Sequence, residues 1–267
     1  MPKSERAALA HIRRVADSVL NETAQGASQP ERGIARPVLL PVPYVSQLGP
    51  GADRFTNSSG AAAGVMLMRA YGQALVTPDE FFLQAGNQAD TPLSLQQIRV
   101  TLGANGVQVE QRSGLKLGEL AIVLITGRPA IIVVKHAVFA QAGLTLESFF
   151  GPHYLVALGL DLENIYLHDP LRRDGSGQGQ AVPWLVLYQA WTQAPTFERG
   201  ILIPRLPLLR RIRVTASTLN LRQGPGTEYD VVGLARSGEV FEVTIHHGDW
   251  GKVGENCWIS LLHIEDI

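Results

Sequence analysis

The chain of 267 residues contains a single cysteine, Cys257. One thiol excludes an internal disulfide framework and any cysteine-rich zinc site. Cys257 stands in a strand-like segment with no helix start nearby, and free cysteine usually packs as a small hydrophobe. We therefore expect Cys257 to be buried rather than to act as a nucleophile, and we expect no metal and no other cofactor.

The chain also lacks an excess of either charge, with 23 Lys and Arg against 24 Asp and Glu and a net charge of −1. Without a basic field, we expect neither nucleic acid nor an anionic membrane as a partner. A long apolar run is missing as well, because Arg13, Arg14, Asp17 and Glu22 interrupt the only candidate near the amino terminus. The sequence thus predicts no signal peptide and no transmembrane segment, and a cytoplasmic protein by default, or one released by a non-classical or phage-type route.

The remaining composition, 45% hydrophobic and 18% charged, is typical of globular protein, and the length predicts about two domains. Residues 5–20 have the apolar spacing of a short amphipathic helix. Its apolar residues are Leu9, Ile12, Val15, Val19 and Leu20. We expect this helix to pack on the core or to mediate self-association, with a propeptide-like cover over a cleft as the alternative. Residues 25–41 are expected to form an extended connector.

The next region predicts helices first and strands later, an α+β arrangement. Helices are expected at 60–72, 78–85, 92–105 and 117–126, and strands at 107–111 and 130–134. Residues 154–158 and 164–168 predict a hairpin turning around Asp161. In that register His153 and Asp169 lie directly opposite each other, with Cβ atoms about 4.5–5.5 Å apart, so the carboxylate would orient the imidazole.

A helix that begins near Ser59 would present unpaired N–H groups and a partial positive charge at its first turn. Such a position stabilises a thiolate or an oxyanion, and the amide of Gln47 would supply a second donor to a tetrahedral intermediate. The four candidate catalytic residues are therefore Gln47, Ser59, His153 and Asp169.

The order and context of these residues resemble the papain-like cysteine peptidases of the bacteriocin-processing type. The resemblance covers roughly residues 38–205 and rests on four short motifs. These are Leu40 to Gln47, Ser59-Gly60 with the helical run to Tyr71, Gly151 to Gly159, and Ile165 to Pro170. It implies a papain-like fold with helices packed on an antiparallel sheet and a substrate cleft between the two halves. The family has a cysteine nucleophile where this chain has Ser59.

This departure matters because a serine hydroxyl has no standing anionic population, whereas a cysteine at a helix start beside a histidine forms a thiolate. Each of the four residues also has a structural alternative. Ser58 or Ser59 is a suitable N-cap for the helix. Gln47 could instead be a solvated loop residue, and His153 could instead be a structural histidine. Asp169 before Pro170 is also a common strand-ending turn.

Three further features compete with or flank this site. His136 follows the apolar strand and is expected to cap or line an edge of the core. His168 is expected to point to the face opposite Asp169. The glycine-rich loop 174–179 is interpreted as a mobile rim of the cleft, with a plain surface loop as the alternative.

After a boundary at 204–211, short alternating strands and turns follow. Residues 212–267 resemble a bacterial SH3-like domain, on the motifs Ser217 to Arg222, Gly224 to Tyr229, Asp249 to Val253 and Trp258 to Ser260. The resemblance implies a small all-β barrel and a ligand such as a peptide or a peptidoglycan-like polymer. Tyr229, Trp250 and Trp258 would form an aromatic groove, or alternatively the core of the barrel.

The domains predicted are an N-terminal helix and linker at 1–37, a peptidase-like domain at 38–205 and an SH3-like domain at 212–267. Three functions remain open. The first is a papain-like peptidase or its nucleophile-deficient, inactive relative, joined to a targeting module. The second is a non-enzymatic peptide-binding protein. The third is a serine acyl hydrolase that uses Ser59, His153 and Asp169.

Overall fold

The structure is a computed structural model, and it describes most of the chain beyond residue 37. The described residues are Ala10, 38–73, 76–87, 90–145, 152–172, 175–194, 200–206, 210–243, 245–247 and 249–267. Apart from Ala10, the amphipathic helix predicted at 5–20, with Leu9, Ile12, Val15, Val19 and Leu20, therefore lies outside the described residues, as does the connector up to residue 37. Self-association through that helix stays a prediction.

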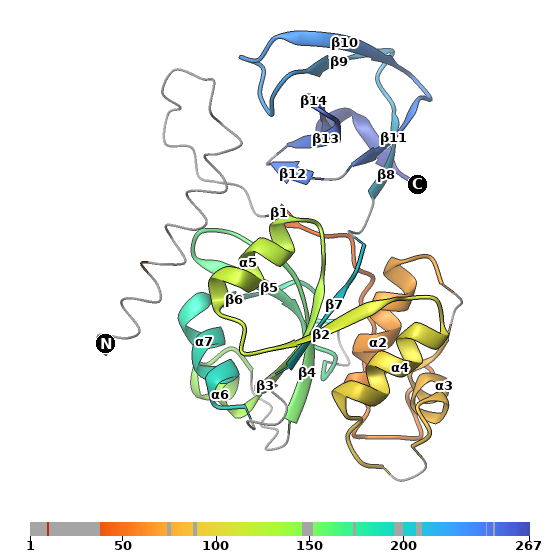
Figure 1. Ribbon diagram of the computed structural model, residues 1–267, viewed down its shortest axis with the longest axis vertical. Helices are drawn as coiled ribbons and strands as arrows, with labels where there is room; N and C mark the ends of the chain where they lie inside the picture. The colour runs from red at the N-terminus through yellow and green to blue at the C-terminus, as the bar shows by residue number, and fades with distance from the viewer. Residues whose placement is uncertain are drawn as a thin grey trace.

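The larger part of the structure is built on a seven-stranded sheet (Figure 1). Its strands are β1 (Val38–Leu39), β2 (Val109–Ser113), β3 (Ala130–Lys135), β4 (Pro152–Leu160), β5 (Asn164–His168), β6 (Gln180–Pro183) and β7 (Gly200–Pro204). The order is β2-β7-β3-β4-β5-β6, β1 pairs with the far end of β4, and every pairing is antiparallel. The apolar run predicted as a central strand is confirmed, because β3 lies between β7 and β4 with five of its six residues buried.

Helices cover this sheet in two groups. They are α2 (Ser59–Ala70), α3 (Pro78–Gln84), α4 (Leu95–Ala104), α5 (Leu117–Ile125), α6 (Ala137–Gln141) and α7 (Trp184–Thr192). Figure 1 shows α2, α3 and α4 together on one side of the strands and α6 and α7 on the other. Capping boxes fix the starts of α3, at Thr77 and Glu80, and of α4, at Ser94 and Gln97. The helix expected at 92–105 therefore begins at Leu95.

Two glycines let α2 approach its neighbours closely. A Cβ atom at Gly60 would lie 2.8 Å from Ile98 Cδ1 and 3.2 Å from Tyr154 Cδ2, and one at Gly64 would lie 2.4 Å from Phe81 Cζ. Real side chains do not pack at such distances, so only glycine permits this separation of α2 from α3, α4 and β4. The beginning of α2 is thereby placed against the strand that carries His153.

The hairpin of β4 and β5 has a different register from the one predicted. The pairs Ala157 with Leu167 and Val156 with His168 place the turn after Asp161 rather than on it, and a register shift separates Ala157 from Gly159. If this register is continued by one residue, Asp169 lies opposite Leu155 of β4. His153 is two residues before Leu155 in the same strand, so it is not the direct partner of Asp169. The direct opposition of His153 and Asp169 was therefore wrong, although a diagonal neighbour on the same face remains within reach of long side chains.

The C-terminal part is all β, as predicted, with one short 3₁₀ turn, η2 (Leu261–His263). Its strands are β8 (Arg210–Val214), β9 (Thr218–Arg222), β10 (Val231–Arg236), β11 (Val240–Val243), β12 (Ile245–His247), β13 (Trp250–Gly254), β14 (Cys257–Ser260) and β15 (Ile264–Asp266). A five-stranded sheet, β10-β9-β14-β13-β12, and a three-stranded sheet, β11-β8-β15, enclose a small core. That core consists of Ile212, Val214, Ala235, Val243 and Ile259. The α+β class with an additional small β barrel is confirmed, while the domain boundaries stay a prediction.

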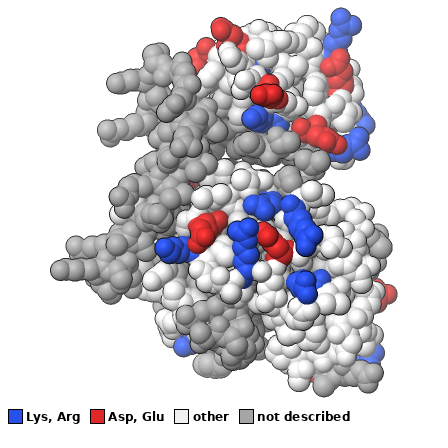
Figure 2. Space-filling view, in the orientation of Figure 1, with Lys and Arg blue, Asp and Glu red and all other residues white. Residues whose placement is uncertain are grey.

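Charges of both signs are interspersed on the face of the molecule shown in Figure 2. Glu110 lies between Arg112, at 3.1 Å, and Arg128, at 3.7 Å, and Arg213 pairs with Glu265 at 2.6 Å. Ion pairs of this kind neutralise the surface locally and create no single-sign field. No helix among the described residues is long and apolar enough to cross a bilayer.

Candidate functional site

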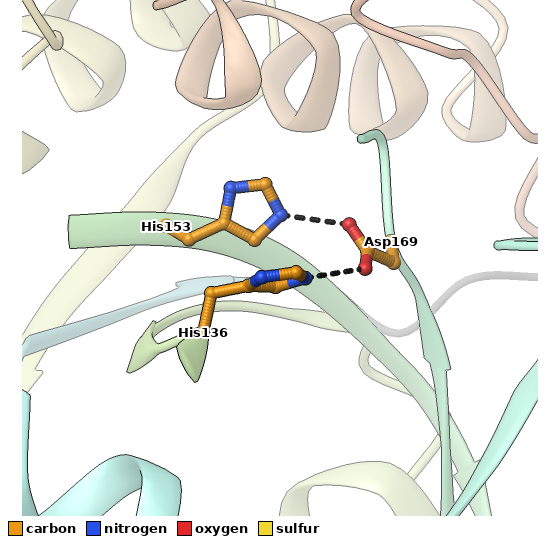
Figure 3. A group of neighbouring side chains, drawn as sticks. All are labelled: His136, His153 and Asp169. Carbon is orange, nitrogen blue, oxygen red and sulfur yellow. Dashed lines mark hydrogen bonds and ion pairs between the residues drawn. The ribbon is translucent and has the colours of Figure 1, made fainter. Parts of the chain in front are cut away.

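Asp169 lies between two imidazoles at the end of β5 (Figure 3). His153 Nε2 lies 2.7 Å from Asp169 Oδ1, and His136 Nε2 lies 3.0 Å from Asp169 Oδ2. All three side chains are at most 1% exposed. The predicted contact between His153 and Asp169 is therefore present, and His136 joins it as a third member.

The cluster is assembled from three neighbouring strands. His153 is the second residue of β4, His136 follows β3 directly, and Asp169 follows β5. The pairing of Val134 with His153 brings the end of β3 alongside the beginning of β4. Since His136 and Val134 are two residues apart in the chain, alternation directs both toward the same face. Edge-to-face contact of the two imidazole rings, with centroids 4.6 Å apart, follows from this placement.

The Asp169 carboxyl is held in its ionised form. Burial alone would raise its pKa, but the charges of His153 and His136 and the hydrogen bonds from both imidazoles outweigh burial and hold the pKa well below its usual value. The backbone N–H of Leu171 also donates to Oδ1, at 3.0 Å. Both oxygens of the buried carboxylate thus accept hydrogen bonds, as an ionised carboxylate requires.

His136 occupies the N-cap position of α6 and is fully buried, in keeping with its expected place capping or lining the core, and its side chain also contacts Asp169. Its Nδ1 is buried and has no hydrogen-bond partner within the described part of the chain. An unpaired buried N–H costs about 1–3 kcal/mol, and more when the group is charged. We therefore place the N–H that His136 directs at Asp169 on Nε2, where it has an acceptor.

These three residues also have the ligand types of a metal site, with ligand atoms within 4.8 Å of one another. Coordination through Nε2 would move the proton of His136 to Nδ1. Histidine ligands normally donate that second N–H to an acceptor, and Nδ1 of His136 has none among the described residues. The arrangement fits a hydrogen-bonded cluster better than a metal centre.

Ser59 is the first residue of α2 and is 5% exposed. Its hydroxyl accepts a hydrogen bond from the backbone N–H of Tyr154, at 3.4 Å. The candidate nucleophile thus lies beside the residue that follows His153. No hydrogen bond joins the Ser59 hydroxyl to the His153 ring in the part of the chain that the structure describes.

The beginning of α2 lacks a side-chain cap, contrary to the capping alternative for Ser58. Ser58 occupies the N-cap position but makes no capping hydrogen bond. Its hydroxyl donates to the carbonyl oxygen of Phe55 at 3.0 Å, and the carbonyl oxygen of Gln47 is a second, longer acceptor at 3.4 Å. The first intrahelical bond runs from Ala62 N to Ser58 O. The first turn therefore keeps the uncapped N–H groups and the positive end of the dipole that favour an anion.

Gln47 lies between the acid and the start of the helix. Its backbone N–H donates to Pro170 O at 2.8 Å, and its Nε2 donates to Thr56 O at 2.8 Å. The side chain is 3% exposed, so the alternative of a solvated loop residue is wrong. Oε1 is buried without a partner among the described residues. The structure thus gathers all four predicted residues, whereas their roles stay predictions.

The described part of the loop after Asp169 contacts the backbone of the site, and its interpretation as a mobile rim stays a prediction. Gly177 O accepts from Asp169 N at 2.9 Å, and a Cβ at Gly177 would lie 2.1 Å from Asp169 O. The hydroxyl of Tyr44 donates to the carbonyls of Asp169 and Arg172 at 2.9 and 2.7 Å. The described part of the loop therefore supports the backbone of Asp169.

Two other candidates are separate from the cluster. His168 Nε2 donates to Val42 O at 2.7 Å and its Nδ1 accepts from Gly179 N at 2.9 Å, so His168 turns away from Asp169 as expected. Cys257 belongs to β14 in the C-terminal part and is partly buried. Burial raises the pKa of its thiol, which favours the unreactive form.

The C-terminal aromatic residues do not share one environment. Trp258 is 5% exposed, with Lys252 and Arg222 as its register partners, which favours the alternative of a core residue, and its contact with a ligand stays a prediction. Tyr229 and Trp250 are partly exposed. Tyr229 packs over Gly224, where a Cβ would lie 2.3 Å from the tyrosine ring.

Residues 217–261 match the family model of the bacterial SH3 domain. The SH3-like resemblance is thereby confirmed for this segment, which includes β9 to β14. Within the SH3 domain, Tyr229 and Trp250 remain the exposed aromatic candidates for ligand contact. No curated protein matches the chain.

Solved structures similar to the chain include three proteins at low sequence identity. One, described as a C39-like peptidase from Bacillus anthracis, has 17% identity and a TM-score of 0.48, over 64% of this chain and 99% of that chain. A double glycine motif protease from an AMS/PCAT transporter, in complex with the leader peptide, has 17% identity and a TM-score of 0.39, over 65% and 93%. Ly7917 has 16% identity and a TM-score of 0.30, over 77% and 84%.

Proposed function

We propose that the chain is a nucleophile-deficient relative of the papain-like peptidases, which binds extended peptides or peptidoglycan-like ligands without cleaving them. In this proposal residues 38–205 form the peptidase-like domain and residues 212–267 the SH3-like targeting module. Gln47, Ser59, His153 and Asp169 occupy the positions of a catalytic site, and Tyr229 and Trp250 contact the ligand of the SH3 domain.

One observation carries the proposal: the Ser59 hydroxyl is bonded to the backbone N–H of Tyr154 and not to an imidazole of the described residues. A serine nucleophile must pass its proton to a base during attack, so it needs a hydrogen bond to that base. A cysteine would not depend on this contact to the same degree, because the helix dipole and a nearby imidazole lower the pKa of a thiol. The site has the features that favour a thiolate and lacks, among the described residues, the contact that a serine needs.

The uncapped start of α2 supports retention of a binding function. Its free N–H groups and the buried amide of Gln47 offer hydrogen bonds to a carbonyl oxygen of a bound peptide. A substrate carbonyl can accept such bonds whether or not it is subsequently attacked. Binding without turnover is therefore the expected behaviour of the wild-type chain.

The test is to restore a thiol. We expect Ser59→Cys to cleave peptides that the wild-type chain only binds, as measured by mass spectrometry of a peptide library and of peptidoglycan fragments. Ser58→Cys is the matched control, because residue 58 points at the Phe55 carbonyl and should gain no cleavage. Binding of the same ligands to the wild-type chain is measured by calorimetry.

Two results would contradict the proposal. Stoichiometric labelling of wild-type Ser59 by a fluorophosphonate, with peptide turnover, would instead establish a serine acyl hydrolase. Failure of folded Ser59→Cys to cleave any peptide would remove the peptidase ancestry and leave binding alone.

A further inference from the structure

His136 has one polar partner among the described residues, and that partner is Asp169. Its Nε2 lies 3.0 Å from Oδ2, and its Nδ1 contacts no acceptor or donor there. The ring is 0% exposed and packs edge-on against Phe139, with centroids 5.8 Å apart, and against His153. A buried histidine that served only to fill the core would not direct its sole hydrogen bond at the acid of the site.

The two oxygens of Asp169 are served by different donors. Oδ1 accepts from His153 Nε2 and from Leu171 N, whereas Oδ2 accepts from His136 Nε2. Without His136, Oδ2 would be an ionised oxygen in a buried position with no donor from the described residues, so the carboxyl would rotate or take up a proton. Either change would loosen its hold on His153.

We infer that His136 is a positioning residue, which donates from Nε2 to Asp169 and holds the carboxylate in the orientation by which Asp169 fixes the ring of His153. This inference rests on the proposed function, because it concerns the same imidazole and acid. Figure 3 shows the consequence for His153, whose second ring nitrogen lies on the side of the ring away from Asp169. In this inference, the ring fixed in this way is the base that exchanges a proton with residue 59.

Few groups in the described part of the chain could replace His136 as the donor to Asp169 Oδ2. The titratable groups on its carboxylate, in the described part, are the two imidazoles, His153 in β4 and His136 directly after β3. His168, the residue before Asp169, points toward Val42. Tyr44, from a distant part of the chain, bonds to backbone carbonyls and not to the carboxylate. Arg172 is directed to the carbonyl of Leu144, at 3.3 Å. His136 is therefore the only donor to Oδ2 that the described residues provide.

The test uses a thiol as a reporter of His153. In a chain carrying Ser59→Cys and Cys257→Ser, the rate of iodoacetamide alkylation at pH 6.5 measures thiolate formed with the help of His153. We expect His136→Leu to lower this rate by about tenfold to a hundredfold, because a misplaced base loses its effect steeply with geometry. His136→Gln keeps an N–H near the position of Nε2 and should stay within about threefold of the parent.

His168→Gln is the control for loss of a buried imidazole outside the cluster, and it too should stay within about threefold of the parent. Circular dichroism verifies that each variant is folded. If folded His136→Leu reacts like the parent, or if His136→Gln is as slow as His136→Leu, the inference is wrong.

A second measurement separates this inference from the proposed function. In the wild-type chain, ¹⁵N-resolved imidazole NMR should show hydrogen-bonded Nε2–H protons on both His136 and His153. His136→Leu should move the His153 signals and His168→Gln should not. If the thiol introduced by Ser59→Cys reacts no faster than a free thiol, the peptidase-type site fails, yet these signals still decide the role of His136. Stoichiometric zinc binding that His136→Leu abolishes would overturn the inference in favour of a metal centre.

Discussion

Gly177→Ala should disturb Asp169 more than its size implies. The new Cβ would lie 2.1 Å from the carbonyl oxygen of Asp169, which is backbone and has no alternative rotamer. The loop or the Asp169 segment must therefore move by about 1 Å, and overpacking of this kind costs about 1–3 kcal/mol. The hydrogen bond from Asp169 N to Gly177 O would be strained as well, at about 1 kcal/mol.

We therefore expect the free energy of unfolding to fall by about 2–4 kcal/mol and the melting temperature to fall by at least about 5 °C. Urea titration followed by tryptophan fluorescence measures the first quantity, and imidazole NMR reports whether His153 still meets Asp169. Gly103→Ala is the control, because Gly103 lies in α4 with Gln108 Nε2 as the nearest atom, at 3.8 Å. It should gain up to about 1 kcal/mol from helix propensity. A Gly177→Ala chain within about 0.5 kcal/mol of wild type, with unchanged His153 signals, would refute the reasoning.

Three further outcomes are expected. Burial lowers the pKa of His168, so the unfolded chain takes up a proton below pH about 6.5 while the folded chain does not. The free energy of unfolding should fall as the pH decreases below that value, and His168→Gln should flatten this part of a plot of urea midpoint against pH. Thr77→Ala removes the capping box of α3 and should cost about 1 kcal/mol in thermal unfolding. Since burial raises the pKa of Cys257, iodoacetamide should alkylate the native chain at pH 7 more slowly than the chain in urea; equal rates would contradict this.

The sequence predicted the elements whose signals are local. The strand at Ala130–Lys135 is a β-branched run with turn residues before it, and the helix at Pro78–Gln84 begins with a cap and a proline. Both were found within a residue or two. The helix α7 and the strands β6 and β7 were not predicted, although the run from Trp184 to Trp191 is apolar at helical spacing.

The sequence singled out His153 and Asp169 but gave neither their register nor the contact of His136 with Asp169. His153 and Asp169 were paired through a turn placed on Asp161, whereas the side chain of Asp161 accepts from Glu163 N and Asn164 N and shifts the turn beyond itself. His136 was missed because its contact depends on the pairing of β3 with β4. That register is set by tertiary packing and leaves no trace in the spacing of either strand alone.

The position of β7 in the sheet constrains how the protein can be made. This strand, residues 200–204, is the last of its sheet along the chain, yet it inserts between β2 and β3 and separates them. On the ribosome, β2 and β3 must therefore wait with open edges until residue 204 has left the exit tunnel, while the neighbouring hairpin of β4 and β5 can already close. A nascent chain stalled before that point would expose the unpaired β2 and the open edge of β3 to aggregation.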